Sequence, residues 1–307
     1  MKNGSVEGTV EARAPDKADV PRFVTLASDD GPGLQRYRAS LARHGIEPDI
    51  VWTGSPYPGH ARAMQLLAAH LRTLDPRESV VYTDGYDVVL IRDPAELAAE
   101  IARFRAPVVI STEPGFTWKL PGRFAASRRY PKRHGRGGMY RFLNSGAYAG
   151  CAGAIADMLE ELDFDSGVDC DQTLFNKWYL DDPSRAALDH DQALFASSAC
   201  QVGLERVLYR YDGSHLVNRR TGGKPFFFHF PAENRLSSGI ILDMLPFRLP
   251  RLPVLLEDRT GYVANLVESR PTWLLDRPAY PLEDVTRMVV FRLLPLLVLV
   301  ALAMWWL

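Results

Sequence analysis

The chain has 307 residues, of which 47% are hydrophobic and 24% charged, a composition that is ordinary for a globular protein with a sizeable core. The formal net charge is −1, so bulk charge gives no reason to expect a nucleic-acid partner. Cys151, Cys170 and Cys200 are odd in number and lack CxxC spacing, which argues against a disulfide framework and a zinc site. We therefore expect buried or free thiols in a reducing compartment.

Residues 1–20 mix glycine, proline and charged residues without an apolar core, so we expect a mobile leader rather than a secretory signal. From residue 21 to 246, apolar runs alternate with segments of helical spacing. The first strands are expected at residues 22–27, 50–52, 80–83 and 107–111. Apolar spacing predicts helices over residues 34–41, 64–74 and 97–104. This alternation predicts an α/β domain with a mostly parallel sheet and helices on both faces.

The stretch from Val80 to Leu90 contains two carboxylates within a β-prone run. Asp84 stands where the buried strand is expected to end, and Asp87 follows the turn at Gly85. Ligands of open α/β sheets bind just beyond the carboxyl ends of the strands, and Mg²⁺ and Mn²⁺ prefer oxygen ligands that they share with substrate phosphates. The pattern indicates a metal platform for a nucleotide diphosphate, with an ordinary Asp-Gly turn and helix cap as the alternative.

The interval between Glu113 and Asp157 contains no acidic residue. Its basic residues are Lys119, Arg123, Arg128, Arg129, Lys132, Arg133, Arg136 and Arg141. Such a loop could close over phosphates, or receive an anionic acceptor or a lipid head group. A solvated basic insertion is the alternative interpretation.

Residues 288–307 are almost entirely apolar and end in a pair of tryptophans. This length and composition predict a transmembrane tail, and a buried C-terminal core helix is the alternative. Arg287 and Arg292 at its upstream end favour membrane association with the preceding domain on the cytoplasmic side. The Arg/Pro-rich segment of residues 247–287 is expected to connect that domain to the tail.

Several stretches occur in the order and approximate spacing of one known family. They are FVTLAS, VVYTDGYDVVL, ISTEPGFTWKLP, RFLNSGAYAG, CDQTLFNKWYL, ALDHDQALF and FFFHFPAENRL. In this order they resemble the glycosyltransferase domain of the procollagen lysyl hydroxylases (PLOD) and the related collagen glycosyltransferases. The resemblance implies a GT-A fold over residues 21–246, a UDP-sugar donor and a Mn²⁺ or Mg²⁺ ion. It does not reach the hydroxylase domains, so no iron or 2-oxoglutarate chemistry is expected.

The resemblance also implies the residues that bind the ion and the donor. Asp84 and Asp87 match the metal-binding carboxylates of the family, and His229 matches its metal-binding histidine. Without the resemblance, a lone histidine in the aromatic run of residues 225–230 would be interpreted as a core residue. The residues expected at the donor are Thr25 and Ala27 at the uridine, Trp118 in a loop over the donor, and Asn144, Ser145 and Gly146 at the sugar hydroxyls.

Asp171 matches the second carboxylate of an Asp-Asp-Gln segment that the family places at the reacting centre. The first carboxylate is replaced here by Cys170, so Asp169 is the other residue expected to take its part. Either carboxylate would position the acceptor hydroxyl and accept its proton, while the ion neutralises charge on the departing UDP.

The predicted function is a UDP-sugar-dependent hexosyltransferase that moves galactose or glucose to an acceptor hydroxyl. The acceptor is a lipid-linked or envelope glycan or a protein, brought within reach by the membrane tail. Two other classes stay open. Cys170 allows a membrane-associated sugar-nucleotide-binding protein with a degenerate site, and a paired-Asp metal site also serves nucleotidyl or phosphoryl transferases.

Overall fold

The computed structural model describes residues 20–131, 136–164, 167–168, 170–198, 205–231 and 235–252. Several expectations fall outside these ranges: residues 1–19 of the expected leader of residues 1–20, Asp169, Cys200, the connecting segment from residue 253 onward and the tail of residues 288–307. What the sequence suggests for them stays a prediction.

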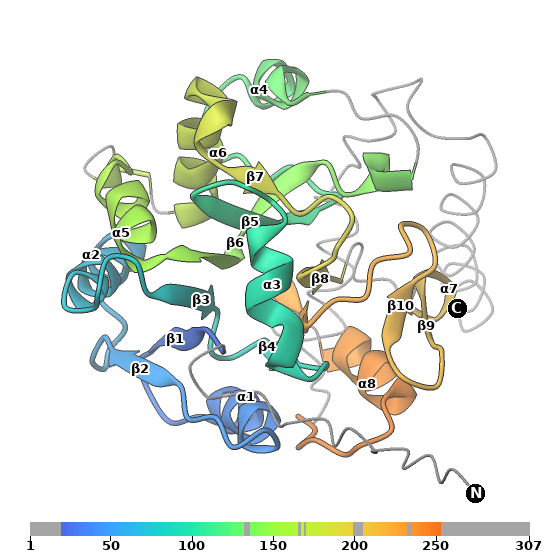
Figure 1. Cartoon of the computed structure of the whole chain (residues 1–307). Helices are drawn as coiled ribbons and strands as arrows, with labels where there is room; N and C mark the ends of the chain where they lie inside the picture. The colour runs from blue at the N-terminus through green and yellow to red at the C-terminus, as the bar shows by residue number, and fades with distance from the viewer. Residues whose placement is uncertain are drawn as a thin grey trace, which may run out of the picture.

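The central sheet contains β1 (Arg22–Ala27), β2 (Asp49–Trp52), β3 (Ser79–Thr83), β5 (Val108–Glu113), β6 (Phe142–Cys151) and β7 (Ala187–Leu188). Their order across the sheet is β2-β1-β3-β6-β5-β7 (Figure 1). β1 pairs in parallel with β2 and β3, and β5 pairs in parallel with β7. β6 alone among these strands runs antiparallel to its neighbours. The predicted α/β fold with a mostly parallel sheet is therefore confirmed.

Helices cover both faces of this sheet. The described α-helices of the chain are α1 (Pro32–Ala42), α2 (His60–Leu71), α3 (Leu97–Ala102), α4 (Arg123–Arg129), α5 (Ala152–Glu160), α6 (Asp171–Asp181), α7 (Glu205–Leu208) and α8 (Arg235–Met244). Buried side chains of α2, α5 and α6 share one core cluster with Val24 and Tyr82, whereas those of α1 and α3 share another with Phe23 and Val81. Because neighbouring residues of a strand point to opposite faces, the two groups of helices lie on opposite sides of the sheet.

A second sheet of three strands determines where the site lies. It contains β4 (Val88–Leu90), β8 (Phe195–Ser197) and β11 (Phe227–His229), with β11 in the centre. β11 runs antiparallel to β4 and parallel to β8. The run from Val80 to Leu90 therefore divides at its turn, with β3 in the central sheet and β4 in the second sheet (Figure 1).

The end of the described chain packs against the domain. Ile241 and Leu242 of α8 are buried in a third core cluster, together with Leu249. The guanidinium of Arg43, just after α1, lies 3.1 Å from the centroid of the Phe247 ring, a favourable cation–π arrangement. A short hairpin of β9 (Tyr209–Tyr211) and β10 (Leu216–Asn218) completes the described strands.

We predict that Asp189 stabilises the loop that leads from β7 to β8. Its buried Oδ1 accepts a hydrogen bond from the backbone N–H of Ala193, and Oδ2 accepts from Leu194 and Phe195, each at 2.8 Å. Asp189→Ala would leave three buried donors unpaired, so the free energy of unfolding in urea should fall by about 3 kcal/mol. Asp191, an exposed neighbour, offers a control. Asp191→Ala should change the free energy of unfolding by less than about 0.5 kcal/mol.

The same carboxyl group makes stability depend on pH. Burial raises the pKa of Asp189 from 3.8 to about 6, against the opposing effect of its three backbone donors. The folded protein then holds this proton more tightly than the unfolded chain does. The contribution of Asp189 to stability should therefore decrease as the pH rises from about 4 to about 6. An Asp189→Ala variant with an undiminished slope over that range would show that another group is responsible.

Candidate functional site

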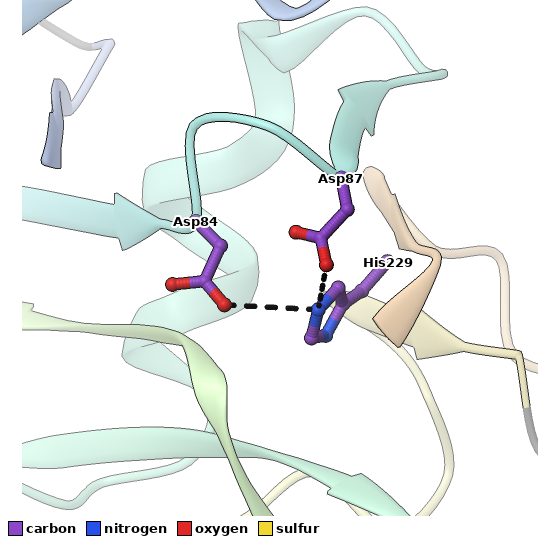
Figure 2. Close-up of side chains that lie close together, drawn as sticks. All are labelled: Asp84, Asp87 and His229. Carbon is purple, nitrogen blue, oxygen red and sulfur yellow. Dashed lines mark ion pairs between the residues drawn. The ribbon is translucent and has the colours of Figure 1, made fainter. Parts of the chain in front are cut away.

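Three side chains from two sheets meet at the carboxyl end of β3. Asp84 follows β3 directly, Asp87 precedes β4, and His229 is the last residue of β11. Figure 2 shows the two carboxylates on either side of the turn, with the imidazole facing both. The turn fits only because residue 85 is glycine, since an added Cβ would lie 2.7 Å from the hydroxyl of Thr25.

The spacing of their polar atoms suits a cation. His229 Nε2 lies 3.4 Å from Asp87 Oδ2 and 3.8 Å from Asp84 Oδ2. One ligand atom from each residue can be chosen so that all three lie within 4.8 Å of one another. Asp87 Oδ1 is buried and has no hydrogen-bond partner among the described residues. A buried carboxylate oxygen without a donor is costly, and a metal ion would satisfy it.

The electrostatics of the cluster also favour a bound cation. Desolvation, and then the charge of Asp87, raise the pKa of Asp84. Burial alone would lower the pKa of His229, but the carboxylates of Asp87 and Asp84 outweigh it and raise the pKa to about 9. The imidazolium thus supplies the positive charge that the two carboxylates require. A divalent cation would supply it instead and release the proton.

Asn144 on β6 orients the imidazole of His229 so that Nε2 could bind a cation. Its Oδ1 lies 3.0 Å from His229 Nδ1 and 3.0 Å from the backbone N–H of Gly146, which donates to it. With Nδ1–H donating to Asn144, Nε2 carries the lone pair and faces the carboxylates. Metal-binding histidines are commonly held in this way by a partner of the second ring nitrogen.

Two further residues hold Asn144 in place. Its Nδ2 donates to Glu113 Oε2 at 3.2 Å, and Gln172 donates to Glu113 Oε1 at 2.5 Å. Burial raises the pKa of Glu113, while the hydrogen bonds from Gln172 and Asn144 act in the opposite direction. Sequence reasoning did not single out Glu113. The available signal was its position at the end of the buried strand β5, which corresponds to the position of Asp84 after β3.

Gly146 keeps the space beside the cluster open. A Cβ at this position would lie 2.7 Å from Asp84 Oδ2 and closer still to the ring carbon Cε1 of His229. Its carbonyl also accepts a hydrogen bond from the backbone N–H of Asp84 at 2.9 Å. Any side chain here would displace Asp84 or His229. Glycine is therefore required at residue 146, because both side chains lie close to its backbone.

These residues line a pocket of about 440 Å³, a size that suits a small-molecule ligand. It brings together most of the residues predicted for the site: Asp84, Asp87, Asn144, Ser145, Gly146, Asp171 and His229. Leu26, Ser28, Tyr57, His60, Met64, Tyr82, Gly85, Tyr86, Gln172 and Pro231 complete its described lining.

Thr25 and Ala27 do not belong to that lining. Both are buried, and the hydroxyl of Thr25 donates to the carbonyl of Thr83 at 2.7 Å. Because side chains alternate along β1, Leu26 faces the pocket while Thr25 and Ala27 point to the other face. Ser28, directly after the strand, also lines the pocket.

Trp118 also lies outside the described lining of the pocket. Its ring stacks on Phe116 with centroids 5.6 Å apart, and Nε1 donates to the carbonyl of Pro121 at 3.1 Å. The structure thus packs this half-buried tryptophan against the core. Within the basic interval, Arg141 is likewise buried and donates to the carbonyls of Ser127 and Tyr130.

Two tyrosines beside the cluster were not predicted as site residues. The hydroxyl of Tyr82 donates to Asp84 Oδ1 at 3.2 Å. The hydroxyl of Tyr86 accepts from the backbone N–H groups of Ser28 and Asp29 at 2.8 and 3.0 Å, which connects the turn between Asp84 and Asp87 to the end of β1. Both lie within the β-prone run itself, so their positions two residues before and two residues after Asp84 were a usable signal.

Comparison with known proteins shows the family of the chain. A family model described as the PLOD GT domain matches residues 17–241. Procollagen-lysine,2-oxoglutarate 5-dioxygenase 1 of Gallus gallus is 25% identical over 210 residues, 64% of this chain and 27% of the relative. The Drosophila melanogaster procollagen-lysine,2-oxoglutarate 5-dioxygenase is 28% identical over 191 residues, 59% of this chain and 25% of the relative.

A third relative is the human multifunctional procollagen lysine hydroxylase and glycosyltransferase LH3, 27% identical over 160 residues, 50% of this chain and 20% of the relative. The chain thus spans about a quarter of the length of the curated relatives it matches. Among solved structures, the apo WbbM bifunctional glycosyltransferase gives a TM-score of 0.43 at 15% identity, covering 73% of this chain and 48% of that one. Since the family model matches most of the chain, the chain belongs to the PLOD glycosyltransferase (GT) domain family.

Proposed function

We propose that this protein is a metal-dependent hexosyltransferase that moves galactose or glucose from a UDP-sugar to an acceptor hydroxyl. The observation that carries the proposal is the cluster of Asp84, Asp87 and His229 inside a pocket of a chain from the PLOD GT domain family. A cluster of two carboxylates and one imidazole in a pocket suits a nucleotide diphosphate bound through a cation.

The donor set favours Mn²⁺ over Mg²⁺. Mg²⁺ is bound mainly by oxygen atoms, whereas Asp84, Asp87 and His229 offer two carboxylates and a ring nitrogen. The bound ion would supply positive charge at the diphosphate as it departs. Asn144 would keep the imidazole of His229 in the tautomer that presents Nε2 to the ion.

The remaining pocket residues would hold the substrates. Ser145 and Gly146 line the pocket beside the cluster, where a hydroxyl group and a bare backbone can approach the sugar closely. Asp171, the first residue of α6, would orient the acceptor hydroxyl. Asp169 is proposed as a second carboxylate at the reacting centre, although it lies outside the described residues.

The acceptor and the location belong to the proposal as well. We propose that residues 288–307 hold the protein at a membrane, with the catalytic domain on the cytoplasmic side and a lipid-linked or envelope glycan or a protein as acceptor. Among the residues described by the structure, no helix is long and apolar enough to cross a bilayer, and residues 288–307 are not among them.

The direct test is a screen of UDP-sugars for UDP release that requires Mn²⁺, with and without a membrane extract as acceptor. Transfer predicts UDP as the product, with more UDP released when the acceptor is present. A nucleotidyl transferase acting on the same donor would instead transfer UMP and release the sugar phosphate. The complete absence of UDP release from UDP-glucose and UDP-galactose would contradict the proposed function.

The metal cluster gives the first prediction. Asp84→Asn and Asp87→Asn keep the size of the side chain but remove a charged ligand, so Mn²⁺-dependent UDP release should fall by at least about 100-fold. Circular dichroism should show an unchanged fold. Asp30→Asn, at an exposed carboxylate near the end of β1, is the matched control and should keep full activity. Near-normal turnover of both cluster variants would refute the proposal that Asp84 and Asp87 bind the metal ion.

The second prediction concerns the amide behind the histidine. Asn144→Ala removes the acceptor of the Nδ1 hydrogen bond, so the affinity for Mn²⁺ should fall by roughly 10- to 100-fold, measured by calorimetric titration. Asn218→Ala offers a comparison, because Asn218 is equally buried and makes side-chain hydrogen bonds to Tyr140 and Gln192. That variant should lose stability but keep its Mn²⁺ affinity.

The third prediction concerns the tail. Full-length protein should sediment with membranes and resist extraction by high salt, because an apolar segment of this length is stable in a bilayer. A chain that ends at Thr286 should stay in the supernatant and still release UDP from its donor. Full-length protein that stays soluble without detergent would contradict the membrane proposal.

A further inference from the structure

Charge is distributed unevenly around the pocket. Its described lining contains three carboxylates, those of Asp84, Asp87 and Asp171, and no lysine or arginine. The groups in that lining able to take a proton and become positive are the imidazoles of His229 and His60. His229 is committed to the metal cluster through Nε2 and to Asn144 through Nδ1. His60 is therefore the imidazole that the cluster does not use.

The structure places His60 against the proposed reacting centre. It is the first residue of α2, and Asp171 is the first residue of α6, so two helix starts from distant parts of the chain meet here. His60 Nδ1 lies 3.7 Å from Asp171 Oδ1 and 3.3 Å from the hydroxyl of Tyr57. The Tyr57 ring meets the imidazole edge to face, at 5.6 Å between centroids and 75° between planes. The imidazole is thus positioned by a carboxylate and an aromatic ring.

We propose that His60 is the base that takes the proton from the acceptor hydroxyl, and that Asp171, besides orienting that hydroxyl, orients the imidazole of His60. This inference rests on the proposed glycosyl transfer. With Nδ1–H directed to Asp171 and Tyr57, the lone pair lies on Nε2. An imidazole is a stronger base than a carboxylate in water and can act near neutral pH. A gap of 3.7 Å is long for a hydrogen bond, but catalytic pairs are commonly longer before substrate binds.

Transfer forms one bond and breaks another at C1 of the sugar. The acceptor oxygen forms a bond to C1 of the sugar, and its proton moves to Nε2 of His60. The bond between C1 and the β-phosphate oxygen breaks, and its electron pair leaves with UDP. The proton then passes to solvent, because the side chain of His60 is 43% exposed. The titratable side chains that line the pocket with His60 are Asp171, Tyr57, Tyr82, Tyr86 and the three residues of the cluster.

Water can replace the unidentified acceptor in the test. The full-length chain is incubated with Mn²⁺ and UDP-glucose or UDP-galactose, and release of UDP to water is measured. His60→Gln should lower kcat by about 100-fold, since general bases contribute 10²- to 10⁴-fold. KM for the donor and affinity for Mn²⁺ should change by less than about threefold, because the metal cluster is intact.

His70 is a matched control on the same helix. It also faces a carboxylate, with Nε2 3.3 Å from Asp49 Oδ2, but lies outside the described lining of the pocket. His70→Gln should keep the wild-type rate. In His60→Ala, added imidazole should restore part of the rate, a result that a purely structural role would not give. Adding Asp171→Asn to His60→Gln should cost little more than His60→Gln alone, because the two act as a pair.

The outcomes separate this inference from the proposed function. If the wild-type chain releases UDP and His60→Gln matches it within about threefold, the base assignment is wrong and the proposed function stands. A His60→Gln variant that loses Mn²⁺ or donor binding in step with kcat would make His60 a binding residue and also overturn the assignment. No release by the wild-type chain would overturn both. Should His60→Gln fail to fold, His60→Asn and the imidazole rescue of His60→Ala decide.

Discussion

His229 faces Asp87 because β11 runs antiparallel to β4 in a register that pairs His229 with Val88, the residue after Asp87. A slip of one residue would turn the imidazole to the opposite face of the sheet. The aromatic neighbours prevent such a slip, since Phe227 is buried in one core cluster while Phe228 is buried in another. The packing of a hydrophobic strand thus fixes the geometry of a polar site, and the hydrogen bonds of Asn144 with His229 and Glu113 refine it.

Local patterns in the sequence were sufficient for β1, β2, β3 and β5 and for the helices α1, α2 and α3, whereas β4 was not predicted as a separate strand. Helical spacing at Leu34, Tyr37 and Leu41 and the apolar run before Asp84 follow from side-chain periodicity, which depends only on neighbouring residues. The antiparallel direction of β6 was not predictable in this way. Its side chains are buried along almost the whole strand, as they would be in a parallel strand, and direction depends on connections rather than on composition.

The site was predictable only in part. Asp84 and Asp87 could be found from their place in a single run, whereas His229 needed a family resemblance, because it comes from another sheet. Thr25 and Ala27 were predicted at the donor, but the pocket lies on the face of β1 to which Leu26 points. A linear motif does not reveal which face of a strand lines a pocket. The contact of His60 with Asp171 joins two helix starts that no local pattern connects.

The separation of the three cluster residues along the chain also has a thermodynamic consequence for a cation that binds to them. Asp84 and Asp87 lie on one turn, and His229 joins them only after β11 has docked between β4 and β8. Closing so long a loop has an entropic cost that an unfolded chain would have to meet before it could assemble these ligands. The affinity for a cation at this site would therefore be coupled to docking of β11, and part of the binding free energy would become folding free energy. A partly folded chain, in which β11 has not yet docked, would then fail to retain the ion that the fully folded chain binds.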